Sequence, residues 1–344
     1  MNESRYPRWP VWLCMTMTIW LAAATVSADP GTRIIAHRGA SAHLPEHTRE
    51  AYLLAYGMGA DFLEPDLVMT ADGALISLHD ATLEATTDVA QRFPTRDRGD
   101  GRFYAMDFTL AEIRSLNFNE RVEPDSGLAR YPARWPVGQG RFQPVTLAEL
   151  IKLVTRLNRT TGRAVGIYPE IKFPSLHREA GHDITAAVVE ELLAHELPRA
   201  DLPVFIQCFE PEPLVRIRRE HGDRFALVQL IGENDWAMNE VDYDAMRTPE
   251  GLSAIARYAD AIGPPIARLV PTDSADRALL ERARANGLAV HPYTFRRESM
   301  PPGVTLERML ALFIHDLKID ALFTDHPDIA LAVRAAAAVK RNDP

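Results

Sequence analysis

Residues 61–80, DFLEPDLVMTADGALISLHD, contain the pattern that decides the fold. Two apolar runs typical of strands, residues 61–70 and 74–80, flank the turn signal at residues 71–73. Parallel neighbouring strands need a crossover of a dozen or more residues, and three residues are too few. The second run should therefore return antiparallel as a hairpin.

Outside this hairpin, strand-like runs alternate with helical patterns. The expected strands, with the hairpin runs included, are residues 33–37, 61–70, 74–80, 164–172, 203–210, 225–232, 260–265, 288–295 and 321–328. The expected helices between and after them are residues 48–59, 146–158, 183–195, 211–221, 251–259, 274–287, 306–317 and 329–339. About eight strand–helix units predict a parallel (β/α)8 TIM barrel, for which ~250 residues is usual. The hairpin strand is the ninth, and no dinucleotide-binding or Walker A pattern follows any strand.

Composition and charge narrow the functional class. The chain has 344 residues, 47% of them hydrophobic and 25% charged, which suffices for an extensive core. Its formal net charge is −9. An acidic surface argues against nucleic acid as the main partner and against adsorption to an anionic membrane, although a local positive pocket for one phosphate remains compatible.

The N-terminus has the pattern of a secretory signal peptide. Two arginines precede the apolar segment 11–25, and small residues follow up to Ala28, after which cleavage is expected. The alternatives are an uncleaved anchor and a lipoprotein formed through Cys14. Cleavage would leave one domain, residues 29–344, with Cys208 as its single cysteine, no internal disulfide and no stable membrane insertion. The sequence does not decide the oligomeric state.

Two stretches interrupt the alternation. Residues 84–143 form a long insertion rich in Pro, Gly, Arg and aromatics, with one helical piece at 109–116, and residues 232–250 form a smaller insertion. Long loops in a compact domain usually act as lids or binding loops. The longer insertion is expected to cover the site, with Arg92, Phe93 and Phe103 as candidate contacts.

Polar residues end most of the strands at their carboxyl side, where barrel enzymes assemble their active sites. These strand-end residues are His37, Arg38, Glu64, Asp66, His79, Glu170, Lys172, Gln207 and Tyr293. For any one of them a structural role would be the simpler interpretation. Their coincidence at successive strand ends indicates a catalytic site.

Glu64 and Asp66 are two residues apart on one strand, so both point to the same face. Two adjacent carboxylates repel one another, so one of them would be protonated unless a cation keeps both ionised. Glu170 would supply a third oxygen ligand, and such a set suits calcium or magnesium. The alternative is an acid/base pair without metal, as in a glycosidase, but those enzymes usually take their carboxylates from separate elements.

The hairpin places His79 across from the Glu64–Asp66 segment, and His37 ends the first strand. Two histidines near a metal-bound phosphate suit general acid–base catalysis near neutral pH. Arg38 and Lys172 could neutralise phosphate oxygens.

Together these motifs resemble one enzyme family. The matching stretches are residues 36–48, AHRGASAHLPEHT; 64–73, EPDLVMTADG; 78–80, LHD; 168–172, YPEIK; 207–210, QCFE; 291–296, HPYTFR; and 322–328, LFTDHPD. In this order they closely resemble the glycerophosphodiester phosphodiesterases. The long insertion looks like that of the periplasmic bacterial branch, and the resemblance covers nearly all of the chain after residue 28.

The resemblance implies a barrel of the phospholipase C-like phosphodiesterase type and a periplasmic location. It implies catalytic His37 and His79; metal ligands Glu64, Asp66 and Glu170; and phosphate-contacting Arg38 and Lys172, with Glu46 in the supporting layer. Gln207 and Tyr293 complete the expected substrate-binding set. The expected cofactor is Ca²⁺, with Mg²⁺ possible, and the substrate is a small glycerophosphodiester such as glycerophosphocholine, cleaved to sn-glycerol 3-phosphate and an alcohol.

One residue departs from the expected pattern. Pro65 lies between two predicted metal ligands and removes a backbone donor, which fits best at a strand edge or a bulge. Its presence predicts a local change in strand pairing.

The remaining polar residues of the motifs receive weaker roles. His43 and His47 are left outside the catalytic set, His291 is expected to be structural, and Asp325 and His326 are expected to cap the last helix. Two rival functions remain, a related phosphodiesterase of intact lipids, which needs an apolar rim, and a non-catalytic binding protein on the same barrel.

Overall fold

The computed structural model describes residues 1, 31–236, 239–270 and 274–341. The predicted signal peptide falls on residues that lie, except for Met1, outside this range. Within it, no helix combines the length and the apolar character needed to cross a membrane.

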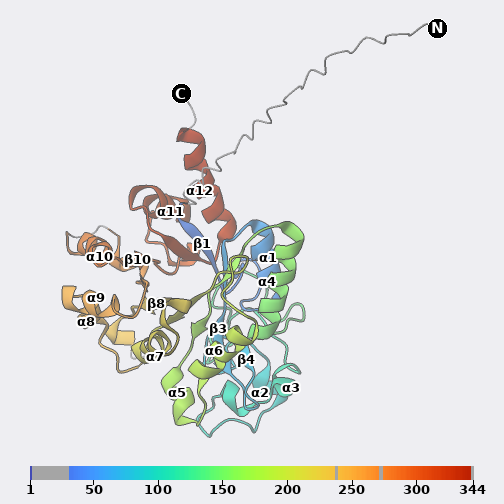
Figure 1. The fold of residues 1–344 in the computed structure, drawn as a ribbon. Helices are drawn as coiled ribbons and strands as arrows, with labels where there is room; N and C mark the ends of the chain where they lie inside the picture. Colours follow the sequence, from blue (N-terminus) through green and yellow to red (C-terminus); the bar gives the residue numbers. More distant parts are fainter. Residues whose placement is uncertain (2–30, 237–238, 271–273, 342–344) are drawn as a thin grey trace. The chain divides into compact units, whose positions relative to one another are not determined.

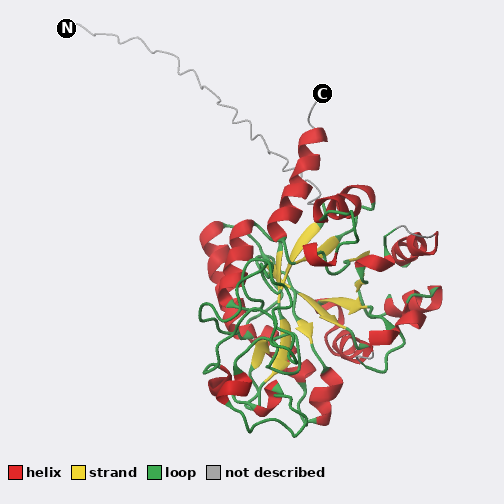
Figure 2. Cartoon of the chain, turned by 180° about the vertical axis from the view of Figure 1, so that it is seen from behind, coloured by secondary structure: helices red, strands yellow, loops and turns green. Residues whose placement is uncertain are grey.

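Parallel strands form two sheets at the centre of the fold, with helices around them (Figures 1 and 2). In chain order they are β1 (Arg33–His37), β2 (Phe62–Glu64), β3 (Asp66–Met69), β5 (Gly166–Ile167), β6 (Glu170–Ile171), β7 (Phe205–Cys208), β8 (Ala226–Leu230), β9 (Ala261–Gly263), β10 (Ala289–Val290) and β11 (Ala321–Thr324). Strand β11 pairs with β1, and a parallel bridge between Phe295 and Thr324 joins the segment after β10 to β11. The predicted (β/α)8 architecture is therefore confirmed.

Pro65 divides one predicted strand into β2 and β3. Strand β2 pairs with β1 and β5, whereas β3 pairs with β6 and β4. The Pro65 carbonyl accepts a hydrogen bond from the Glu170 amide at 2.8 Å, so the interruption lies directly beside the carboxylates. The change in pairing that the proline predicts is present.

The quoted stretch forms a hairpin. Strand β4 (Leu75–Ser77) pairs antiparallel with β3, with Ile76 opposite Val68, and Gly73 takes a positive φ of 82° in the turn. The ninth strand is therefore an addition to the edge of β3 and not a barrel strand, as predicted.

Helices surround the strands (Figure 2). They are α1 (Arg49–Met58), α4 (Leu147–Thr161), α5 (Pro174–Glu179), α6 (Ile184–Ala194), α7 (Pro211–His221), α8 (Tyr243–Met246), α9 (Pro249–Ile255), α10 (Ser274–Ala285), α11 (Leu306–Ala311) and α12 (Pro327–Arg341). Short turns are η1 (Ala105–Asp107), η2 (Gly222–Arg224), η3 (Asn234–Trp236), η4 (Ile266–Arg268), η5 (Arg297–Ser299) and the π-helical η6 (Leu312–Asp316). Thr48, the first residue of the helix expected at 48–59, caps α1: its side chain accepts a hydrogen bond from the Ala51 amide.

Alternation along the strands divides the core into two layers. Ile34, Leu63 and Leu227 belong to the large cluster that also contains helix residues, whereas Ile35, Phe62 and Val228 belong to a second cluster made from strand residues. Because successive strand residues face opposite sides, the second cluster fills the barrel interior. The catalytic end of the barrel rests on this packed interior.

The insertion 84–143 folds onto the hairpin. Its helices α2 (Val89–Arg92) and α3 (Leu110–Ile113) lie beside β3 and β4 in Figure 1. Phe108, Ile113 and Phe118 are fully or almost fully buried in one cluster with Val68 and Ile76 of the hairpin. The insertion thus has a core of its own, built on the strands that carry Asp66 and precede His79.

Candidate active site

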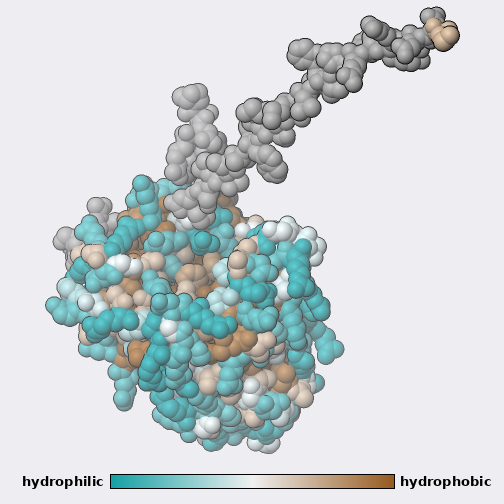
Figure 3. Space-filling model, in the orientation of Figure 1, coloured by the Kyte–Doolittle hydropathy of each residue, from teal (hydrophilic) through white to brown (hydrophobic). Residues whose placement is uncertain are grey.

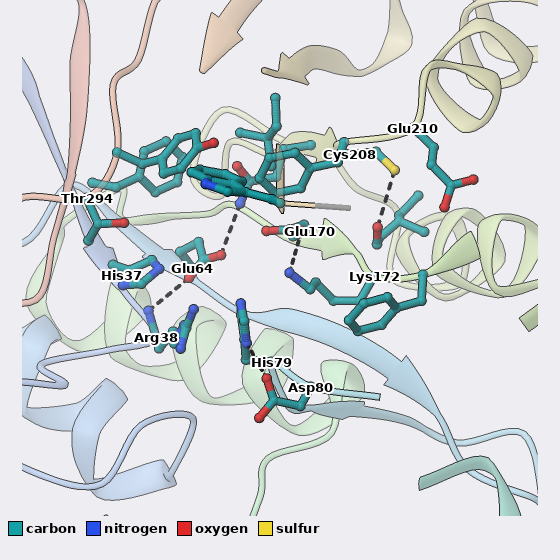
Figure 4. A pocket seen from close by; sticks show the side chains of 18 of the residues that line it. His37, Arg38, Glu64, His79, Asp80, Glu170, Lys172, Cys208, Glu210 and Thr294 are labelled. Carbon is teal, nitrogen blue, oxygen red and sulfur yellow. Dashed lines mark hydrogen bonds and ion pairs between the residues drawn. The ribbon is translucent and has the colours of Figure 1, made fainter. Parts of the chain in front are cut away.

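A cavity of about 370 Å³ opens at the carboxyl ends of the strands (Figure 4). Most of the residues predicted for the site line it: His37, Arg38, Glu64, His79, Glu170, Lys172, Gln207 and Tyr293. Its size suits a small molecule. Strand register explains the convergence, because His37 lies beside Glu64, Asp66 beside Glu170, and Glu170 beside Gln207.

Three buried carboxylates form the centre of the site. Glu64 and Asp66 are each 1% exposed and Glu170 is 6% exposed. One oxygen from each lies within 4.8 Å of the other two. Burial and the nearby Asp66 charge raise the pKa of Glu64 well above its ordinary value, and burial raises the pKa of Glu170 to about 8. Added positive charge beside the three groups would favour their ionised forms.

Two cations already face this cluster. The Lys172 ammonium lies 2.8 Å from Glu170 Oε1 and 3.7 Å from Asp66 Oδ1. Arg38 Nε lies 3.0 Å from Asp66 Oδ2, and the Arg38 amide donates to Glu64 Oε2 at 2.8 Å. Burial opposes ionisation of Asp66, but Lys172 and Arg38 hold its pKa well below its ordinary value.

The loop after β1 reaches this geometry through strained backbone. Arg38 has φ 59° and His47 has φ 63°, both in the left-handed region that non-glycine residues seldom adopt. Gly39 has φ 86°, and an added Cβ there would lie 2.7 Å from the Ala51 carbonyl carbon. Glycine is therefore the residue that fits this turn without a steric clash.

His47 was predicted to lie outside the catalytic set, yet its ring touches the carboxylate cluster. It is 1% exposed, with Nε2 2.9 Å from Asp66 Oδ2 and Nδ1 2.9 Å from the Tyr52 hydroxyl. The tyrosine hydroxyl in turn donates to the Glu64 carbonyl at 3.3 Å. His47 therefore orients the Asp66 carboxylate, and its place in the stretch 36–48 was the available signal.

His37 forms a hydrogen-bonded pair with Asp325, with Nδ1 2.7 Å from Oδ1. The prediction that Asp325 caps the last helix is wrong. It lies at the end of β11 and turns into the barrel, where Arg134 Nη2 binds its other oxygen at 2.7 Å and Arg296 Nε lies 3.3 Å away. Burial and Arg38 lower the pKa of His37 to about 4, although Asp325 raises it.

His79 forms an equivalent hydrogen-bonded pair with Asp80, with Nδ1 2.6 Å from Oδ1. Arg121 Nη1 binds the other Asp80 oxygen at 2.5 Å. Desolvation, followed by the charges of Arg38 and Lys172, lowers the pKa of His79 to about 3. A carboxylate only accepts hydrogen bonds, so both histidines carry their proton on Nδ1 and leave Nε2 as the free nitrogen.

Glu46 supports the site without lining the cavity. Its carboxylate accepts from Arg38 Nη1 at 3.1 and 3.2 Å and from Arg121 Nη2 at 2.6 Å. It therefore links the loop after β1 to the insertion, which agrees with its predicted place in a supporting layer.

Gln207 and Tyr293 both line the cavity but are already bonded. Gln207 Nε2 donates to Glu64 Oε1 at 3.0 Å, while its buried Oε1 has no hydrogen-bond partner among the described residues. The Tyr293 hydroxyl donates to the Ile231 carbonyl at 2.8 Å. Of the two, Gln207 presents an unpaired oxygen beside the carboxylates.

The insertions contribute to the wall, but through other residues than predicted. Arg92 donates to the Ser115 carbonyl, and Phe93 and Phe103 pack in or against the core of the insertion. None of these three lines the cavity. The lining residues from the insertions are Arg121, Arg130, Tyr131, Trp236 and Asn239. The aromatic residues proposed as lid contacts serve instead to hold the insertion together.

Three other histidines lie outside the cavity lining. His291 is 4% exposed and bonds the Tyr168 hydroxyl at 2.7 Å, which agrees with its structural prediction. His43 Nε2 lies 3.2 Å from Asp328 Oδ1, and His326 Nε2 accepts weakly from the Arg297 amide at 3.4 Å. Neither contacts the carboxylate cluster.

Comparison with known proteins agrees with this site. The model of the glycerophosphoryl diester phosphodiesterase family matches residues 37–329. The chain belongs to this family. It is 37% identical over 318 residues to a glycerophosphodiester phosphodiesterase of Haemophilus influenzae, covering 86% of this chain and 87% of the relative. A Treponema pallidum enzyme of the same name is 31% identical over 345 residues, covering 92% and 96%.

Solved structures share the fold. A glycerophosphodiester phosphodiesterase of Agrobacterium tumefaciens has a TM-score of 0.57 at 22% identity, covering 88% of this chain and 99% of that chain. An Oleispira antarctica phosphodiesterase in complex with the product sn-glycerol-3-phosphate has a TM-score of 0.59 at 21% identity, covering 88% and 96%. Family membership therefore places the chain among phosphoric diester hydrolases that act on small glycerophosphodiesters.

Proposed function

We propose that the chain hydrolyses glycerophosphodiesters such as glycerophosphocholine to sn-glycerol 3-phosphate and an alcohol, with a divalent cation. The observation that carries this proposal is the arrangement of three buried carboxylates between two histidines, each paired with its own aspartate. The Oleispira relative, which holds sn-glycerol 3-phosphate as product, supports the substrate class.

The residues present fit a hard cation. Glu64, Asp66 and Glu170 supply three convergent oxygens, and the unpaired Oε1 of Gln207 lies on the next strand. Burial raises the pKa values of Glu64 and Glu170, which supports added positive charge beside the set. We propose Ca²⁺, with Mg²⁺ as the alternative, because oxygen ligands suit both. When bound, the cation would act as a Lewis acid toward the phosphoryl oxygen.

The side chains of the site then take separate roles in charge stabilisation and proton transfer. Arg38 and Lys172 offset charge on the phosphate oxygens as it develops. Nε2 of one histidine removes a proton from the nucleophile, while Nε2 of the other protonates the departing alkoxide. The pKa values of His37 and His79 are lowered in the free site, and a bound negative substrate would raise them, so that the ring acting as the acid carries a second proton on Nε2.

The nucleophile is water or the 2-hydroxyl of glycerol, and the latter route gives a cyclic phosphate that is then hydrolysed. A substrate analogue without the 2-hydroxyl distinguishes them. Undiminished turnover of the analogue would exclude the cyclic route, and loss of turnover with binding retained would support it.

A release assay tests the function. The enzyme is stripped with EDTA, reloaded with Ca²⁺ or Mg²⁺, and supplied with glycerophosphocholine, while choline and sn-glycerol 3-phosphate are measured separately. We expect equal amounts of both products, abolished by stripping and restored by the cation. Activity untouched by EDTA, or release of phosphocholine with glycerol, would contradict the proposal.

Intact lipids are a less suitable substrate class. On the face drawn in Figure 3, apolar side chains form separate patches among hydrophilic ones, so that face offers no continuous apolar belt. The rival lipid phosphodiesterase predicts cleavage of diacyl phospholipids in vesicles, which the same choline assay can measure. The non-catalytic alternative is set aside, because the family and the relatives are enzymes.

We also propose export to the periplasm, with residues 1–28 as a signal peptide and residues 29–344 as one catalytic domain. The support is the sequence pattern ending at Ala28. Mass spectrometry of protein from a periplasmic fraction should show a mature chain that begins at Asp29. A chain that begins at Met1 would contradict cleavage.

A further inference from the structure

Both histidine–aspartate pairs end on an arginine from the same insertion. Arg134 binds Asp325, which binds His37; Arg121 binds Asp80, which binds His79. The aspartates and histidines come from the ends of β1, β4 and β11, whereas both arginines lie within residues 84–143. One continuous segment of the sequence therefore supplies the outermost residue of both series of hydrogen bonds.

The Arg134 contacts are almost completely enclosed. Its side chain is 4% exposed, and its guanidinium donates to Asp325 Oδ2 at 2.7 Å, to Glu298 at 2.8 and 3.0 Å, and to the Ser41 carbonyl at 3.2 Å. It also stacks 3.9 Å over the ring of Tyr131. Arg134 does not line the cavity, so it reaches the substrate only through other residues.

The Arg121 contacts are similar but more open toward the substrate. Its side chain is 9% exposed and bridges Asp80 at 2.5 Å and Glu46 at 2.6 Å. Arg121 lines the cavity, and Glu46 continues to Arg38. Replacing Arg121 therefore disturbs His79, Arg38 and the cavity wall together, whereas Arg134 offers a test through one histidine.

We propose that Arg134 and Arg121 are positioning residues, and that the insertion serves to fix both catalytic histidines through Asp325 and Asp80. This inference rests on the proposed roles of His37 and His79. A buried aspartate with one oxygen on the imidazole needs a partner for the other oxygen, or it rotates or loses its charge. Arg121 supplies that partner to Asp80, and Arg134 supplies it to Asp325 at 2.7 Å, closer than Arg296 Nε at 3.3 Å.

Burial distinguishes these pairs from ordinary surface ion pairs. Arg98 and Asp107 form two hydrogen bonds at 2.7 and 2.8 Å in the same insertion, but their side chains are 40% and 31% exposed. Such exposed pairs contribute little to stability, and this one touches no site residue. Arg98 is therefore the matched control for Arg134.

The test uses the full mature enzyme with its cation and glycerophosphocholine. For Arg134→Gln we expect kcat to fall on the order of 10- to 100-fold with KM within about twofold, as for other residues that orient a reacting group. Arg134→Lys should recover part of the kcat lost in Arg134→Gln, because lysine restores the positive charge but not the several planar N–H donors of the guanidinium. Arg98→Gln should match the wild type in both constants.

Asp325→Asn provides a second route to the same result. It removes the charge between Arg134 and His37 but leaves the Arg134–Glu298 pair in place, and we expect the same fall in kcat with KM retained. Wild-type kcat in Arg134→Gln or Asp325→Asn would overturn the proposal. So would an equal loss in Arg98→Gln, because the effect would then be general loosening of the insertion. Full activity in His37→Ala would instead refute the proposed function itself.

Discussion

The barrel strand ends and the insertion contribute different kinds of groups to one cavity. The strand ends place Glu64, Glu170, both histidines and the lysine directly against the cavity, with Asp66 close to the two glutamates. The insertion places Arg134 behind this layer and Arg121 partly behind it. If the proposed roles hold, the barrel supplies the reacting groups and the insertion fixes their orientation.

The two regions also depend on different packing. The barrel end rests on an interior of strand residues such as Ile35, Phe62 and Val228. The insertion rests on a separate cluster around Phe108 and Phe118 that shares Val68 and Ile76 with the hairpin. Changes in the first region should therefore remove the chemistry, and changes in the second should slow it.

The largest effect should follow loss of a barrel carboxylate. Glu64→Ala should abolish calcium binding and turnover, because two carboxylates remain and the hydrogen bond from the Arg38 amide is lost. Isothermal titration with Ca²⁺ and the choline assay measure both. Glu123→Gln, an exposed site in the insertion, is the control and should behave as wild type. Tight calcium binding by Glu64→Ala would contradict the ligand assignment.

Loss of either histidine comes next. His37→Ala and His79→Ala should each lower kcat by about 10²- to 10⁴-fold, the usual contribution of a general acid or base. Calcium affinity and thermal unfolding should stay close to wild type, because the hydrogen-bond partners of the two rings are Asp325 and Asp80 and not the three proposed metal ligands. His195→Ala, at the residue that follows α6, is a matched control. Near wild-type kcat in either variant would exclude that histidine from catalysis.

His47 should give an intermediate effect through the cation. Its ring orients Asp66 from the side opposite the cavity, so His47→Ala should weaken calcium binding by about 10- to 100-fold. Excess Ca²⁺ should restore most of the turnover. Failure of saturating Ca²⁺ to restore turnover would show that His47 has a role beyond holding Asp66.

The smallest effect on chemistry should come from the core of the insertion. Phe108→Ala should lower the free energy of unfolding by about 3–5 kcal/mol, as for other buried aromatic truncations. We expect a modest loss of kcat and unchanged calcium affinity, because the carboxylates belong to the barrel. Denaturant unfolding and calcium titration measure these quantities. A parallel loss of calcium affinity would show that the two regions are not separable.

The sequence predicted the barrel region well for physical reasons. Strand–helix alternation predicts a parallel barrel, and catalytic residues gather where its strands end. The hairpin followed from three intervening residues, and the interruption of the strand followed from Pro65. These inferences depend on local patterns, which a single sequence displays.

The insertion could not be predicted in the same way. Its contacts join residues far apart in the chain, such as Arg134 with Asp325 and Arg121 with Glu46. No helical or strand periodicity in the sequence indicates such contacts. Phe93 and Phe103 were expected to face the site because aromatic residues often line binding loops, but here burial in the insertion core prevails. Asp325 was predicted as a helix cap because it precedes α12, although its side chain turns to His37.

A double-mutant cycle between Arg134 and Asp325 tests the central claim most directly. The kcat values of the wild type, Arg134→Gln, Asp325→Asn and the double variant are measured with glycerophosphocholine at saturating Ca²⁺. If Arg134 acts through Asp325, the double variant should be about as active as Asp325→Asn alone, because the second change removes nothing further. Losses that multiply would contradict this account and assign Arg134 an independent role.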